Sequence, residues 1–134
     1  PVATEFEQED IGTTENKCFR YFQKFTSGGA VYQTYGIGLN YATTNWAGTI
    51  SLISPMRATP VLGTTGTAAN YAIVHNNDTV TAASAVPAIA ANSDNPKSAI
   101  LLTCAVSSGL DAGDVGRLVS NNNDDSFLSF DAEL

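Results

Sequence analysis

Charge is scarce in this sequence, and positive charge most of all. Charged residues make up 14% of its 134 positions, and six Lys and Arg residues stand against thirteen Asp and Glu residues. Nucleic-acid binding depends on clustered basic side chains that displace counterions from phosphates. The net charge of −7 therefore argues against a nucleic-acid partner and, for the same reason, against an anionic membrane surface.

Long apolar runs are also missing. No stretch of the sequence approaches the roughly 18 consecutive apolar residues of a membrane-spanning helix, and no signal-peptide pattern is present. We therefore expect no membrane insertion.

Cysteine is rare, which limits metal and redox chemistry. The two cysteines, Cys18 and Cys104, lie far apart and share no metal-ligand spacing. Both sit in apolar segments, so we expect two buried, reduced thiols, with one long-range disulfide as the alternative. We expect neither a metal nor a cofactor.

Catalytic motifs are missing too. His75 is the single histidine, no nucleophile motif accompanies it, and the "NND" that follows is typical of a turn. We interpret it as a surface or turn histidine at a strand end. The acidic residues gather toward the two ends of the chain, where solvated charge explains them better than the paired carboxylates of glycoside hydrolysis. We therefore expect no enzymatic activity, and a polysaccharide-degrading enzyme is the weakest functional hypothesis.

Small polar residues and short alternating segments dominate what is there. Apolar residues make up 43% of the 134 positions, enough for one domain that buries about two-thirds of its unfolded surface. Asn, Thr, Ser and Gly favour strands and turns over solvated helices. We expect an extended lead-in at residues 1–12 and a single β-sandwich domain at residues 13–134.

The spacing of apolar residues predicts an all-β fold. The segment "TTENKCFRYFQKF" (13–25) predicts a short helix, capped by Thr13 or Thr14, that leads into a strand. About ten short strands are expected in all, separated by turns such as "NND" and "NSDNP", with no long helix. This spacing predicts an antiparallel β-sandwich, jelly-roll-like, with one short N-terminal helix.

Two segments have one wholly apolar face. In residues 98–106 and 126–134 these faces are Ile100, Leu102, Cys104 and Val106, and Leu128, Phe130, Ala132 and Leu134. We expect both segments to be strands inside a sheet. Burying a large apolar side chain is worth roughly 1.5–3 kcal/mol, so exposing the last strand would cost much of a domain's stability.

The segment 31–41 also alternates, with glycines in it. A regular strand would place Val31, Tyr35, Ile37, Leu39 and Tyr41 on one face. Gly36 and Gly38 predict bulges or the close approach of another backbone.

The segment "NNNDD" (121–125) offers oxygen ligands. It lacks the spaced acids and the terminal bidentate Glu of a dedicated calcium loop. A hairpin turn, in which Asn and Asp tolerate positive φ, is the favoured interpretation, and calcium binding is the alternative.

Trp46 is the best candidate for binding chemistry. It lies in the polar segment "TTNWAG", with Asn45 and Tyr41 nearby, and an aromatic ring beside amides is suited to gripping a sugar. Tryptophan is also large and usually mostly buried. The two hypotheses are therefore a glycan-binding site formed by Trp46, Asn45 and Tyr41, and a structural role for Trp46 in the core or at a subunit contact.

Three blocks of the sequence resemble a family of bacteriophage virion domains. They are "VATEFEQEDIGTTENKCFRYFQKF" near the start, "SPMRATP" in the middle and "SGLDAGDVGRLVSNNNDDSFLSFDAEL" at the end. The blocks stand in the family's order and span essentially the whole chain, although residues 63–94 match nothing in it. The resemblance implies a β-sandwich at the C-terminal end of tail fibres, head fibres or related appendages.

The resemblance also implies a homotrimer and no catalytic residue. It makes Cys18, Arg20, Tyr21, Met56, Arg57 and the ending 132–134 part of the framework. We expect a virion protein whose partners are its own copies, other virion proteins and host-surface glycans. The alternative is a capsid or tail decoration or scaffold domain that binds only virion proteins. Strands apolar on both faces, as at residues 100–102, suit elements covered by a partner chain.

Overall fold

The computed structural model describes residues 10–91 and 97–133. Two helical segments precede or interrupt the strands: the α-helix α1 (Ile11–Phe19) and the short 3-10 helix η1 (Ala68–Asn70). The described residues also form ten strands: β1 (Phe22–Thr26), β2 (Thr34–Ala42), β3 (Asn45–Ser51), β4 (Val61–Thr64), β5 (Tyr71–His75), β6 (Thr79–Ala82), β7 (Ala88–Ile89), β8 (Ala99–Ala105), β9 (Val115–Ser120) and β10 (Phe127–Asp131).

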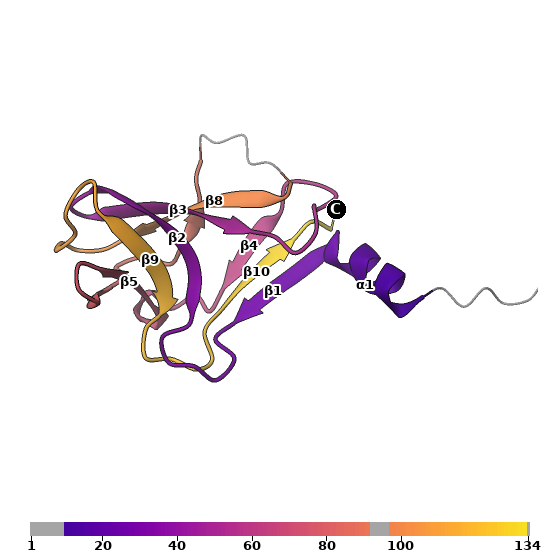
Figure 1. Ribbon diagram of the computed structural model, residues 1–134, viewed down its shortest axis with the longest axis horizontal. Helices are drawn as coiled ribbons and strands as arrows, with labels where there is room; N and C mark the ends of the chain where they lie inside the picture. The colour runs from indigo at the N-terminus through magenta and orange to yellow at the C-terminus, as the bar shows by residue number, and fades with distance from the viewer. Residues whose placement is uncertain (1–9, 92–96, 134) are drawn as a thin grey trace, which may run out of the picture.

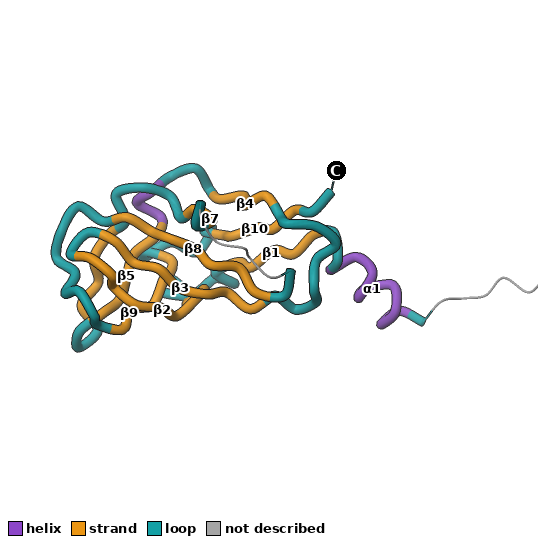
Figure 2. Tube along the Cα trace, turned by 90° about the horizontal axis from the view of Figure 1, so that it is seen from above, coloured by secondary structure: helices purple, strands orange, loops and turns teal. Residues whose placement is uncertain are grey.

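The strands form two antiparallel sheets (Figures 1 and 2). The smaller sheet has the order β1-β10-β4, and the larger, curled sheet has the order β6-β5-β9-β2-β3-β8-β7. Every named strand pair is antiparallel, and tight turns join the β2–β3 and β5–β6 pairs directly. The predicted fold class, an all-β sandwich with one short N-terminal helix, is confirmed.

The two segments with an apolar face are interior strands, as predicted. β8 alternates in burial along its whole length and pairs with β3 and β7, and Val106 follows it, also buried. β10 is the middle strand of the smaller sheet, between β1 and β4. Leu128, Phe130 and Ala132 are buried, whereas Leu134 lies outside the described residues.

Helix α1 begins earlier than the sequence predicted. It starts at Ile11 rather than after Thr13 or Thr14, and Asp10 precedes it without a capping hydrogen bond from its side chain. Residues 10–12 of the expected lead-in therefore belong to the helix or its cap. None of its residues is buried, and Figure 1 shows it projecting from one end of the domain.

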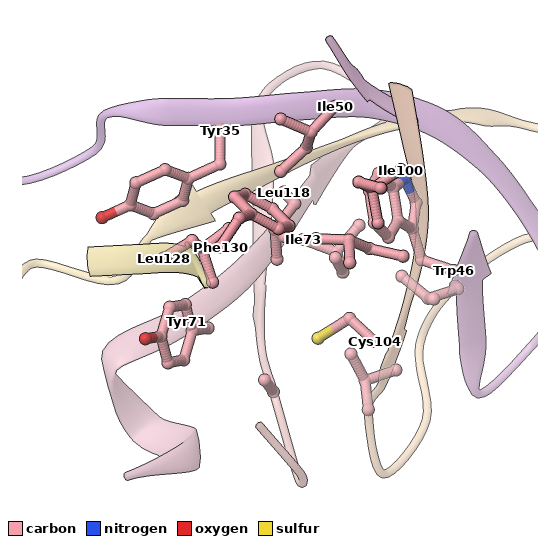
Figure 3. Close-up of a cluster of buried hydrophobic side chains, with 14 of the residues drawn as sticks. Tyr35, Trp46, Ile50, Tyr71, Ile73, Ile100, Cys104, Leu118, Leu128 and Phe130 are labelled. Atoms are coloured by element: carbon pink, nitrogen blue, oxygen red, sulfur yellow. The ribbon is translucent and has the colours of Figure 1, made fainter. Parts of the chain in front are cut away.

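The core fills the space between the two sheets (Figure 3). The smaller sheet contributes Phe25 and Phe130, whose rings pack edge to face with their centroids 5.9 Å apart. The larger sheet contributes aliphatic and aromatic side chains from β3, β5, β8 and β9, among them Trp46, Ile73 and Leu118. Tyr71 bridges the layers, because its hydroxyl donates to the Phe127 carbonyl at 2.6 Å.

Candidate functional site

The structure places Trp46 in the core and not on the surface. Its side chain is 0% exposed, at the second position of β3 rather than in a polar turn. Its indole Nε1 donates to the Gly116 carbonyl at 2.9 Å. A ring without solvent contact cannot stack on a sugar, so the prediction of Trp46 as a glycan platform is wrong and the structural alternative holds.

Glycines make the room that Trp46 occupies. Gly48 on β3, Gly38 on β2 and Gly116 on β9 stand in register across three neighbouring strands. A Cβ at Gly48 would lie 2.2 Å from Trp46 Cζ2, and one at Gly116 would lie 2.8 Å from Trp46 Cδ1. A side chain at either position would therefore collide with the indole. The close approach predicted from the glycines of residues 31–41 is present here, at Gly38 against the β3 backbone.

The two other members of the predicted glycan site are separated from the indole. Tyr41 is 59% exposed near the end of β2, and Asn45 is half-buried, its amide donating to Thr44 Oγ1 at 3.0 Å. The three residues are neighbours in the β2–β3 hairpin, but Trp46 has no exposed surface, Asn45 has some and Tyr41 is mostly exposed.

The face of β2 that points to solvent carries its large apolar residues. The pairing of β2 with β9 shifts register between Thr34 and Gly36, and both Tyr35 and Gly36 are buried. This bulge reverses the alternation that the sequence predicted for residues 31–41. Ile37 and Leu39, expected on the face of Tyr35, are instead 61% and 54% exposed.

This exposed surface continues onto neighbouring strands. Leu39 stands opposite Ala47 on β3 and Val115 on β9, and Val115 is 62% exposed. Ile37 stands opposite Thr49, which in turn faces Leu101 on β8. We call Ile37, Leu39 and their outward neighbours Ala47, Thr49, Leu101 and Val115 the outer apolar face. Arg117 on β9, opposite Ile37, and the exposed Thr49 interrupt this surface. Exposed apolar side chains gathered on neighbouring strands mark a candidate interaction site.

His75 ends β5, as predicted, but it is more buried than a surface histidine. Only 6% of the residue is exposed, and Nε2 shares a hydrogen bond with Thr81 Oγ1 at 2.9 Å. Within the described part of the chain, its Nδ1 has no partner.

The two cysteines differ, where the sequence predicted two buried thiols. Cys104 is buried, and burial raises the pKa of its thiol to about 12. Cys18 is exposed on α1. Neither forms a disulfide, so the long-range bridge considered as the alternative is not present.

The "NNNDD" segment is a turn, but it joins two sheets and is not a hairpin. It connects β9 of the larger sheet to β10 of the smaller one. Asn122 has a positive φ of 46°, and Asn123 Oδ1 accepts from the Asp125 backbone N–H at 2.8 Å.

Among residues 10–91 and 97–133, no group of three or more His, Cys, Asp or Glu side chains is placed to hold a metal. Within the same residues, no helix has the length and apolar character to cross a bilayer.

The three sequence blocks that carry the family resemblance meet at one end of the sandwich. The Gln23 side chain donates to the Ser54 carbonyl at 2.7 Å and accepts from the Ile53 N–H at 2.8 Å. Arg57 N donates to the Arg20 carbonyl at 2.8 Å, beside Met56, which is buried. The last block joins through the bond from Ala132 N to the Tyr21 carbonyl, 2.7 Å long, and through β10.

Comparison of the chain with protein-family models, curated proteins and solved structures yields no significant match in any of the three. The family resemblance stays a prediction that rests on the three sequence blocks alone.

Proposed function

We propose that this chain is a structural protein of a bacteriophage virion, a homotrimeric domain of a tail or head fibre that contacts the host surface. The virion class rests on the resemblance of the three sequence blocks, and the observation that supports self-association is the outer apolar face. Three large apolar side chains, those of Ile37, Leu39 and Val115, are each more than half exposed on two adjacent strands of one sheet.

Self-association explains why such a face persists. At about 25 cal/mol per Å² of apolar surface removed from water, covering these side chains favours assembly, whereas leaving them wet favours non-specific aggregation. Copies of one chain in a closed symmetric ring would cover the same face on each. The small outward residues of β3, Ala47 and Thr49, let a neighbouring backbone approach closely.

The ends of the domain fit a terminal appendage. Helix α1 and the end of β10 lie together at one end of the domain, whereas β5 and β9 lie at the other (Figures 1 and 2). An attachment to other virion proteins through the α1 end leaves the β5–β9 end directed away from the particle. The proposed location is the virion.

The test is the mass of the purified chain in solution. Size-exclusion chromatography with light scattering is expected to give about three chains per particle at micromolar concentration, because the resemblance of the sequence to the virion domains implies a homotrimer. A monomer at that concentration overturns the proposal.

Adhesion separates this proposal from its alternative, a decoration or scaffold domain that contacts only virion proteins. With Trp46 in the core, adhesion has to use other surface groups. Binding of the purified trimer to host cells or to host-surface glycans favours the fibre. A trimer that binds virion proteins and no host component favours the decoration domain.

A further inference from the structure

A small cleft with a mixed polar and apolar lining lies beside the turn between β5 and β6. Its volume is about 220 Å³, and it is lined by Val74, His75, Asn76, Asn77, Asp78, Val115 and Arg117. The lining comes from two chain segments that the pairing of β5 with β9 brings together, with Val74 opposite Arg117. The volume is below the ~300–1,000 Å³ of sites for drug-sized ligands, so the cleft suits one small ring.

The turn at the mouth of the cleft has an unusual backbone. Asn76, Asn77 and Asp78 have φ values of 27°, 50° and 61°, so three consecutive non-glycine residues lie in the left-handed region. Asn and Asp tolerate this region better than other residues, and clustered outliers of this kind are concentrated at binding and active sites.

Contacts from outside the turn hold its side chains in place. Arg117 Nη2 donates to Asp78 Oδ1 at 2.9 Å, and Asn76 Nδ2 donates to Asp111 Oδ2 at 2.7 Å. At the base of the turn, Nε2 of His75 is engaged with Thr81, which leaves Nδ1 as a buried polar atom without a partner in the described chain. These contacts restrain the Asn76 amide and the Asp78 carboxylate before any ligand arrives, although the Arg117–Asp78 pair is a surface one, with Asp78 86% exposed.

The chemistry of the lining matches a neutral sugar. Each hydroxyl of a hexose both donates and accepts, and the cleft offers amides that do both, a carboxylate that accepts and a guanidinium that donates. Arg117 is already neutralised by Asp78, and the chain carries a net charge of −7, so a phosphate or another anion is disfavoured. Val115 lines the edge of the cleft and also belongs to the outer apolar face, so a sugar ring can pack on it only if the proposed trimer leaves its cleft side uncovered.

We propose that this cleft binds a single neutral hexose unit, presented by a host-surface glycan. The cleft lies at the β5–β9 end of the domain, opposite α1 (Figure 1). The host source of the sugar rests on the proposed function, whereas sugar binding itself does not.

Amide NMR spectra of the full chain test the proposal. The probes are the methyl α-glycosides of glucose, galactose and mannose, each titrated at millimolar concentration. At least one is expected to shift, saturably, the signals of Asn76, Asn77, Asp78 and Arg117.

Asp78→Asn keeps the size of the side chain and a residue that tolerates positive φ, but removes the carboxylate and the ion pair. It is expected to weaken binding by about tenfold or more, since hydrogen bonds to charged groups contribute roughly 1.5–3 kcal/mol.

The matched control is Asp125→Asn, the same change in the exposed turn between β9 and β10. It is expected to leave the affinity unchanged. The proposal is overturned if none of the three glycosides shifts these signals, or if both variants bind as the unaltered chain does. A monomer that binds a glycoside contradicts the proposed homotrimer and supports sugar binding in the cleft. A trimer that binds none of the glycosides supports the homotrimer and contradicts sugar binding in the cleft.

Discussion

The two faces of the larger sheet follow opposite rules along strands β2, β3 and β9. The inner face has three glycines in register, Gly48, Gly38 and Gly116, and a single tryptophan that covers two of them. The outer face has isoleucine, leucine and valine where a sheet exposed to water would carry polar residues. On the inner face, the single indole of Trp46 fills the space beside Gly48 and Gly116.

The difference separates folding from assembly. The inner face is filled by contacts within the chain, and the Trp46 ring has no solvent contact left to make. The outer face has apolar surface that the fold of one chain leaves uncovered. The same three strands therefore serve the domain on one side and, in our proposal, its neighbours on the other.

The largest expected effect comes from emptying the inner face. Trp46→Ala removes a fully buried indole and its bond to Gly116, and is expected to lower the free energy of unfolding by about 3–5 kcal/mol. Chemical denaturation followed by circular dichroism measures it. Tyr41→Ala, which removes an exposed ring from the adjacent strand, is expected to change stability by about 0.5 kcal/mol or less. Equal losses in the two variants would show that the indole does not fill the core.

Overfilling the same face has a smaller effect. Gly48→Ala places a methyl group 2.2 Å from Trp46 Cζ2, so the indole has to move, at an expected cost of about 1–3 kcal/mol. Ser51→Ala, at the exposed end of the same strand and outside the outer apolar face, is the control and is expected to be nearly neutral. A shift of the thermal midpoint in the first variant alone is the expected result. A neutral Gly48→Ala would mean that the indole has free space beside it.

Sequence reasoning predicted the parts of this sheet that depend on local alternation. β8 and β10 have one apolar face each, and burial follows that pattern residue by residue. The face of Ile37 and Leu39 was predicted wrongly because it depends on the bulge between Thr34 and Gly36, which exists only in the pairing with β9. The bulge predicted at Gly36 is present, but the faces predicted for Ile37 and Leu39 assumed a regular strand without it.

The candidate site was less accessible to sequence reasoning than the fold. Trp46 stands among polar neighbours, and its burial is decided by glycines on β3 and β9, one of them 70 positions away. The cleft unites His75 to Asp78 with Val115 and Arg117, which come together only through the β5–β9 pairing. A signal was present, because the "NND" after His75 marks residues that tolerate positive φ, but it predicts a turn and not a cleft.

On the outer face, charge is expected to affect assembly and leave the fold nearly unchanged. The double variant Ile37→Glu, Leu39→Glu places two carboxylates on positions that are solvent-exposed in the single chain, so the variant is expected to keep its circular-dichroism spectrum as a folded monomer and to lose only the stability that association adds. In a covered interface the same charges would be desolvated and unpaired, so the trimer is expected to dissociate. Light scattering on the variant measures its mass. Thr26→Glu, an exposed position on the smaller sheet, is the control. Persistent trimers in the double variant would place the interface elsewhere.

The two cysteines offer the mildest test of inside against outside. A thiol whose pKa is about 12 is almost wholly protonated at about pH 8, and Cys104 is also buried, so both reactivity and access are suppressed. Cys18 is exposed on α1. One thiol per folded chain is therefore expected to react at once with a disulfide reagent, and the second only in denaturant. In Cys18→Ser the fast reaction disappears while stability changes by about 0.5 kcal/mol or less. Rapid reaction of both thiols in the folded chain would mean that the sheet carrying Cys104 opens. The inner face of that sheet would then not be closed to solvent.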